Sequence, residues 1–148
     1  MMMKRLITFV SLLLSCGSVA VASDFGTKEQ SQDIAGQLSA IVQTGGVDAG
    51  IDAMHDPSQP FSTSTLGIHL FEDGIIVGDN REPELLAAAY TEVEDLTGEP
   101  MWPRIVAAAD MRDDAMLEWY HYDTEVEYTY ACYSEWAIEG TALIMVCR

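Results

Sequence analysis

The sequence predicts an α+β domain: one antiparallel five-stranded sheet with a long N-terminal helix and helices packed on one face. The patterned segments run in the order two helices, two strands, two helices and three strands. Strands that follow one another are separated by short turn signals, which join antiparallel neighbours. These two observations favour a single sheet with helices packed on it.

The first helix is expected over residues 28–44, where Ile34, Leu38 and Ile41 recur at three- and four-residue steps. That spacing places apolar side chains on one helix face. The pair Gly45-Gly46 then ends the pattern, because glycine is a poor helix former. A short second helix is expected over residues 47–55.

A β-hairpin is expected next, with strands at residues 66–71 and 75–77 on either side of Asp73-Gly74. Asp-Gly is a strong signal for a two-residue turn. Pro83 favours a helix start, so residues 83–90 are interpreted as a helix. A loop at 95–99 leads to another helix over 102–111.

Three strands are expected to close the chain, at residues 116–122, 125–134 and 141–147. Asp123-Thr124 and Glu139-Gly140 are the turns between them. Side chains alternate between the two faces of a strand. Leu117, Trp119 and His121 therefore share one face of the first of these strands.

Residues 1–22 are typical of a secretory signal peptide, and residues 23–148 form one domain. Lys4 and Arg5 precede a short apolar run that ends in an Ala-x-Ala cleavage site at Ala22. The protein is thus expected to be periplasmic or secreted, without a transmembrane segment in the mature chain. Cys16 lies in a sequence similar to a lipobox, so anchoring as a lipoprotein through Cys16 stays open.

The domain is strongly acidic, with a formal net charge of −17 for the whole chain. Phosphate contacts require basic surfaces, so nucleic acid is excluded as a partner. The chain has no H-E-x-x-H, Cys-x-x-Cys or EF-hand spacing and no G-x-S-x-G elbow. We therefore expect no metal, no cofactor and no enzymatic activity.

Cys132 and Cys147 remain as an even pair in an oxidising compartment. If Glu139 and Gly140 form a two-residue turn, Ile138 faces Thr141, and counting outward places Cys132 opposite Cys147. Directly opposed residues lie within disulfide range. The register thus predicts a disulfide, and two buried free thiols are the alternative.

Three features are similar to those of a known family. A long helix leads into a hairpin with a tight Asp73-Gly74 turn. Residues 80–85 are followed by 95–98 and a helix that begins near Trp102. The aromatic strand 117–121 pairs with a second aromatic strand. Over about residues 28–148, the chain resembles a single Cache domain, an extracytoplasmic PAS-like sensor module.

The resemblance implies a PAS-like sheet that binds a small organic ligand, often a short carboxylate or an amino acid, between the sheet and a helical layer. Such domains usually form the outer part of chemoreceptors or sensor kinases. Because the sequence ends at Arg148 without a membrane-crossing helix, we expect a separate membrane partner of that kind to receive the signal. The alternatives are a non-enzymatic periplasmic accessory protein with a filled pocket and a cystatin-like fold.

The candidate ligand-binding residues are aromatic or basic. By the resemblance, Trp119, His121 and Tyr130 correspond to pocket positions. The same strand face includes Tyr128, and Arg104 beside Trp102 has the fork geometry that holds a carboxylate. The alternatives are a packed sheet core for the aromatic residues and a surface ion pair for Arg104. The candidate set is Trp102, Arg104, Trp119, His121, Tyr128 and Tyr130.

Overall fold

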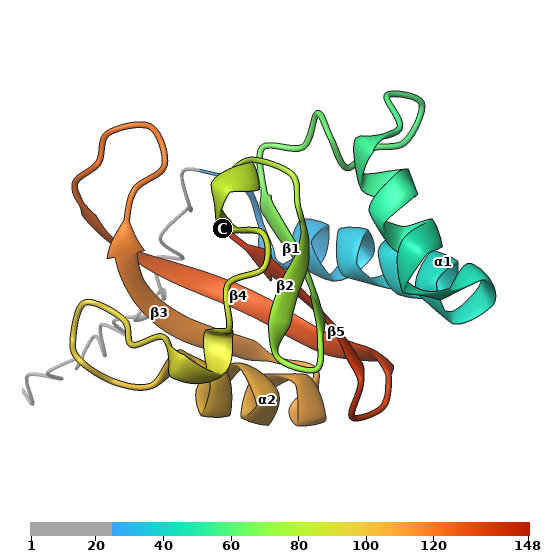
Figure 1. Ribbon diagram of the computed structural model, residues 1–148. Helices are drawn as coiled ribbons and strands as arrows, with labels where there is room; N and C mark the ends of the chain where they lie inside the picture. Colours follow the sequence, from blue (N-terminus) through green and yellow to red (C-terminus); the bar gives the residue numbers. More distant parts are fainter. Residues whose placement is uncertain (1–24) are drawn as a thin grey trace, which may run out of the picture.

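The computed structural model describes residues 25–148 (Figure 1). The predicted signal segment, with Cys16, lies outside the described residues. Among the described residues, no helix has the length and apolar character needed to cross a bilayer. The elements are α1 (Lys28–His55), β1 (Gly67–Glu72), β2 (Ile75–Asp79), the short 3₁₀ helices η1 (Pro83–Leu85) and η2 (Tyr90–Glu92), α2 (Met101–Met111), β3 (Asp114–Tyr120), β4 (Glu127–Ile138) and β5 (Ala142–Cys147).

The five strands form one antiparallel sheet in the order β2-β1-β5-β4-β3, which confirms the predicted fold class. The last strand of the chain, β5, is therefore the central one, and all six of its residues are buried. Because β5 is covered on both faces, it reads as a continuous apolar run with no polar alternation.

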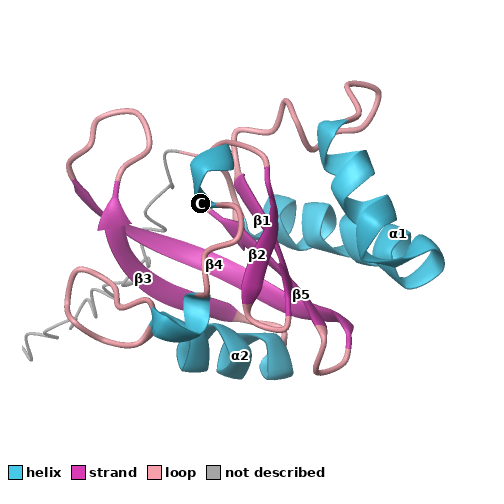
Figure 2. Cartoon of the chain, in the orientation of Figure 1, coloured by secondary structure: helices cyan, strands magenta, loops and turns pink. Residues whose placement is uncertain are grey.

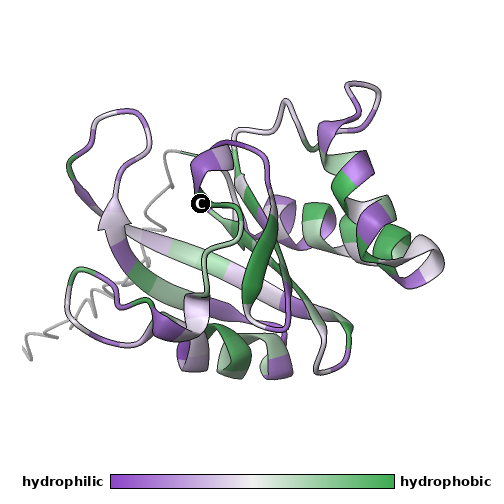
Figure 3. Ribbon diagram, in the orientation of Figure 1, coloured by the Kyte–Doolittle hydropathy of each residue, from purple (hydrophilic) through white to green (hydrophobic). Residues whose placement is uncertain are grey.

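Helices cover both faces of this sheet (Figure 2). Side chains of β5 alternate between two cores: Ile144 and Val146 pack in the α1 layer, whereas Leu143 and Met145 pack in the α2 layer. The green apolar positions of the sheet in Figure 3 lie between these layers. The expected one-sided layer thus corresponds to α2 and the 3₁₀ helices, and α1 packs on the opposite face.

Helix α1 contains both predicted N-terminal helices. It begins with a capping box, in which the Thr27 hydroxyl accepts from the Gln30 N–H and the Gln30 side chain accepts from the Thr27 N–H. Gly46 interrupts the helix with φ 85° and ψ 177°. This left-handed φ is accessible to glycine without strain, so the glycine pair bends the helix where the sequence predicted a break.

The predicted helix over residues 83–90 is wrong. Only η1 and η2 form there, separated by Ala87 with φ 69°. The backbone N–H groups of Ala87 and Tyr90 donate to carbonyls of β2 and its turn, at Ile76 and Gly74. Pairing along β2 replaces helical hydrogen bonds, so the tertiary environment overrides local propensity.

The predicted β4–β5 register is confirmed from Cys132/Cys147 to Trp136/Leu143. The predicted two-residue turn is wrong, because the register shifts after Trp136 and Ile138 pairs with Ala142. Within the turn, the Thr141 N–H donates to the Ile138 carbonyl at 3.0 Å. The extra residue forms a bulge at the turn and leaves the rest of the ladder unaffected.

A disulfide joins Cys132 to Cys147, as the register predicts, and both residues are buried. Their Cα atoms lie 4.0 Å apart on neighbouring strands. The bond links β4 to the central strand β5 and faces the α2 layer. It therefore fixes the part of the sheet that lies under the cavity described below.

The loop before α2 covers the free edge of β3. The Asp95 carboxylate accepts from the Glu118 N–H at 3.2 Å, and the Leu96 N–H donates to the Glu118 carbonyl at 3.0 Å. Arg104 bridges the same loop and strand, because it pairs with Asp95 at 2.8 Å and donates to the Met116 carbonyl. An exposed strand edge can pair with another chain, and these contacts occupy the outward-facing backbone groups at Met116 and Glu118.

Asp95 is held in its ionised form. Burial alone would raise the pKa of its carboxyl, but the Thr97 hydroxyl, Arg104 and the backbone N–H of Glu118 outweigh burial and hold the pKa well below its usual range. A carboxyl with a depressed pKa stabilises the fold above its unfolded-state pKa, and this contribution is lost as the pH falls.

Removal of the disulfide is expected to destabilise the domain. Replacing both cysteines (Cys132→Ala with Cys147→Ala) opens a loop with a sequence separation of 15 residues. The free energy of unfolding in urea should fall by about 3 kcal/mol, because the unfolded chain regains entropy. A loss below about 1 kcal/mol would show that the bond adds little to what the sheet already fixes.

The variant Asp95→Asn should lower the free energy of unfolding at pH 7 by about 2 kcal/mol, since it removes charged hydrogen bonds. The difference from the wild type should shrink as the pH is lowered from 7 to 3 in urea titrations, because the wild-type carboxylate loses its contribution there. Glu99→Gln in the same loop is the control, since the Glu99 side chain is exposed. A pH-independent difference would contradict the role given to the charge.

Candidate functional site

A cavity of about 220 Å³ lies between the α2 face of the sheet and the chain segment that follows β2. Its floor is formed by β1, β5, β4 and β3, and its roof by residues 81–93, which include the segment 83–90. Drug-sized ligands occupy larger pockets, of roughly 300–1,000 Å³. The size therefore fits a small metabolite rather than a drug-sized ligand.

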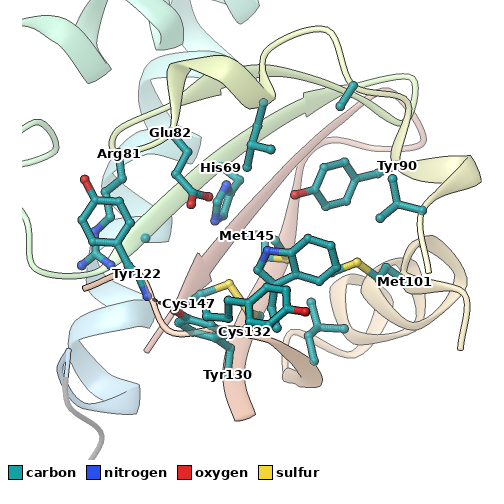
Figure 4. A pocket seen from close by; sticks show the side chains of 17 residues that line it. His69, Arg81, Glu82, Tyr90, Met101, Tyr122, Tyr130, Cys132, Met145 and Cys147 are labelled. Atoms are coloured by element: carbon teal, nitrogen blue, oxygen red, sulfur yellow. Dashed lines mark hydrogen bonds between the residues drawn. A yellow bond between two sulfur atoms is a disulfide. The ribbon is translucent and has the colours of Figure 1, made fainter. Parts of the chain in front are cut away.

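Most of the cavity wall is apolar. Met145 and the Cys132–Cys147 disulfide lie in the floor, Leu85 lies in the roof, and Met101 from α2 closes one end (Figure 4). Leu117 and Val93 complete this part of the lining. Such a surface favours an apolar ligand body and offers no hydrogen bonds to bound water.

The opposite end of the cavity is polar and is organised by a buried carboxylate, Asp79. The side chain of Asp79 is fully buried, and its Oδ2 lies 2.6 Å from Nδ1 of His69. Its Oδ1 accepts from the backbone N–H groups of Arg81 and Glu82, at 2.8 and 2.6 Å. These bonds turn the chain at the end of β2 and direct the next two side chains to the cavity.

Asp79 remains ionised in this setting. Burial alone would raise the pKa of the carboxyl, but the contact with His69 and the two backbone N–H groups together lower it below its ordinary value. The carboxylate thus orients the His69 ring, with Nδ1 toward Asp79, and leaves Nε2 for the cavity side.

Arg81 is the cation of this polar end. Its guanidinium lies 4.6 Å from the centre of the Phe25 ring and 5.1 Å from that of Tyr122. Burial lowers the pKa of Arg81, yet an arginine keeps its charge in proteins. Within residues 25–148 no ion pair to Arg81 is formed, so aromatic rings hold it and its hydrogen-bond donors remain available.

Gly67 leaves open the space toward which these groups converge. A Cβ atom at Gly67 would lie 3.4 Å from Nε2 of His69 and 4.0 Å from Nη1 of Arg81. Two nitrogen atoms thus meet around one small space on the cavity wall. A carboxylate oxygen placed there could accept hydrogen bonds from Arg81 and from a protonated His69.

Aromatic side chains form the remaining wall. Tyr130 stabilises the β3–β4 hairpin. Its hydroxyl accepts a hydrogen bond from the Tyr122 N–H at 3.0 Å and donates one to the Tyr120 carbonyl at 3.1 Å. Tyr120 and Tyr122 line the cavity and are also half-exposed, so they mark the side that opens to solvent. Burial raises the pKa of Tyr90, in the roof, to about 12, so this tyrosine is a neutral hydrogen-bonding group.

Two of the six candidate ligand residues, Trp119 and Tyr130, line the cavity, and the other four do not. The guanidinium of Arg104 pairs with Asp95 at the edge of β3. The ring of Trp102 packs beside Phe71, with a centroid distance of 5.3 Å. Both α2 side chains therefore serve the packing of the loop and the helix.

His121 and Tyr128 lie in the cluster around Phe25. The His121 ring stacks on Phe25 at 4.8 Å, and its Nδ1 accepts from the backbone N–H groups of Asp123 and Thr124. Tyr128 packs edge-on against Phe25 at 5.8 Å. These contacts shape the β3–β4 turn and seat it on the residues that precede α1.

Sequence reasoning did not select His69, Arg81 or Glu82. A signal was available, since His69 interrupts the apolar strand 67–71 and Arg81 is one of few basic residues in an acidic chain. No spacing rule connects them, because the sheet register pairs His69 with Asp79 across two strands.

As for metals, residues 25–148 contain no group of three His, Cys, Asp or Glu side chains that could hold an ion.

No family model matches the chain, and no curated protein matches it in sequence. Several solved structures are similar to the chain in fold. A methyl-accepting chemotaxis protein from Vibrio parahaemolyticus RIMD 2210633 is 12% identical, with a TM-score of 0.57 over 81% of each chain. A Cache chemosensory domain described for carboxylic acid recognition is 9% identical, with a TM-score of 0.59 over 81% of this chain and 90% of the other.

A periplasmic sensor domain of a chemotaxis protein is a third similar structure, at 11% identity and a TM-score of 0.53 over 81% of this chain and 88% of the other. At such identities the likeness concerns the fold. The chain has the PAS-like fold of Cache chemosensory domains.

Proposed function

We propose that this protein is an extracytoplasmic sensor domain that binds a small carboxylate in the cavity, with Arg81 as the anchor. The observation that carries the proposal is a partly buried guanidinium at the polar end of an otherwise apolar cavity, which lies against Phe25 and Tyr122 without an ion pair in the described part of the chain. Arg is suited to planar, two-point recognition of a carboxylate.

In this proposal the carboxylate lies in the space beside Gly67, between Arg81 and Nε2 of His69. The ligand body lies over Met145 and the disulfide, against Leu85 and Val93. Binding removes the guanidinium and the apolar wall from water together. The hydrogen bonds give orientation and the apolar contact adds affinity.

The predicted signal peptide, the disulfide and the similarity to periplasmic sensor domains support a location outside the cytoplasm. The ligand-bound state would then be read by a membrane partner such as a chemoreceptor or sensor kinase. The residues that line the cavity fit ligand binding better than catalysis, since no nucleophile is paired with a base among them. The open cavity also favours ligand binding over the alternative of an accessory protein with a filled pocket.

Arg81→Met should weaken the binding of short carboxylates by about 10- to 100-fold, because it removes a charged hydrogen-bond donor and keeps much of the side-chain length. Isothermal titration calorimetry with propionate, butyrate and pyruvate measures the change. Arg112→Gln is the control, since Arg112 is exposed and lies outside the cavity lining. Equal affinities for wild type and Arg81→Met would refute the anchor.

Gly67→Ala tests the position of the carboxylate without a change in charge. The added methyl group would occupy the space between His69 and Arg81 and should abolish or strongly weaken binding. Gly36→Ala is the matched control, because a Cβ there meets no atom within 4 Å. Gly67→Ala protein that melts like the wild type and still binds propionate with the same affinity would place the ligand elsewhere.

A further inference from the structure

The polar end of the cavity contains more acid than an anion-binding site needs. The carboxyl of Glu82 in the cavity lining and that of Asp79 behind it both interact with Arg81, which is the permanent cation of this lining within residues 25–148. In Figure 4 the Glu82 carboxyl lies next to the His69 ring. If His69 is neutral and both carboxyls are ionised, the cluster carries a net negative charge. An anionic ligand would then be repelled by the two carboxylates as well as attracted by Arg81.

His69 can reverse that balance by taking up a proton. Its Nδ1 lies 2.6 Å from Oδ2 of the ionised Asp79, and the adjacent negative charge favours a hydrogen on Nδ1 rather than on Nε2. Neutral His69 presents a lone pair at Nε2, which repels a carboxylate oxygen in the space beside Gly67. Protonated His69 presents an N–H donor at the same point.

Glu82 is the second group that can take up a proton. Burial raises the pKa of its carboxyl, and the neighbouring Asp79 raises it further. Protonation of Glu82 would remove a negative charge from the cavity wall. Since Asp79 is held ionised, the Glu82 carboxyl and the His69 ring are the groups of this cluster that can accept a proton.

Within residues 25–148, the groups that the other elements bring to this cluster do not supply a compensating positive charge. Asp123 of the β3–β4 turn acts on Arg81, and Glu84 acts on Glu82, with negative charge in each case. Tyr90 of the roof stays neutral, because burial raises its pKa to about 12. The pKa of Tyr130, on β4, is also raised by burial. A proton is therefore the available compensating charge.

We infer that a carboxylate enters this cavity together with a proton taken up by the His69–Glu82 pair, so that affinity rises as the pH falls. This inference rests on the proposed carboxylate site and specifies its ligand as a singly charged acid. A dicarboxylate would place a second anion beside Asp79 and Glu82 or in the apolar end. The domain would thus report a short monocarboxylic acid and acidity jointly.

Calorimetry with propionate at pH 8.0, 7.0 and 6.0 tests the inference, because propionate stays largely ionised in this range. The dissociation constant should fall by about tenfold per pH unit where one proton is taken up. Titrations in two buffers of different ionisation enthalpy should give different heats, which count the protons directly. Succinate should bind at least about tenfold more weakly than propionate.

The variant Glu82→Gln separates the protein's protons from the ligand's. It should bind propionate more tightly than the wild type at pH 8.0 and depend less on pH, and His69→Gln with Glu82→Gln should show no proton uptake. Equal affinity at all three pH values with buffer-independent heats would overturn the inference and leave the carboxylate site intact. Failure of propionate, butyrate and pyruvate to bind at any pH would overturn the proposed function itself.

Discussion

The buried carboxylate of Asp79 is the interaction on which the cavity depends. It lies at the end of β2, accepts two backbone N–H groups from the residues that follow, and orients His69 on the neighbouring strand. A buried charge is costly unless it is fully paired. The chain therefore has to turn at this point, and the turn carries residues 81–93 over the sheet as the cavity roof.

The sheet and its disulfide could be predicted because their signals are local. Apolar runs and turn residues define the five strands, and the alternation of side chains fixes which residues face each other. The Cys132–Cys147 pairing followed from that register together with the even number of cysteines in an oxidising compartment. The roof could not be predicted in this way. Its leucines and alanines favour a helix, whereas pairing with β2 supplies hydrogen bonds that only the folded sheet provides.

The site itself was predicted only in part, and the two arginines explain why. Arg104 and Arg81 are both basic residues near aromatic or acidic neighbours in an acidic sequence. In the fold, Arg104 reaches Asp95 and the edge of β3, whereas Arg81 lies against Phe25 and Tyr122 at the cavity. Long-range contacts decide between an ion pair and an available donor, and no spacing within the sequence encodes them.

A crystal structure of residues 23–148 grown with propionate tests the central claim most directly. We expect electron density for the ligand in the cavity, with its carboxylate within hydrogen-bond distance of the Arg81 guanidinium beside Gly67 and its alkyl group over Met145 and the disulfide. A cavity filled by side chains, or a propionate bound at Arg104 with Arg81 turned away from the cavity, would contradict it.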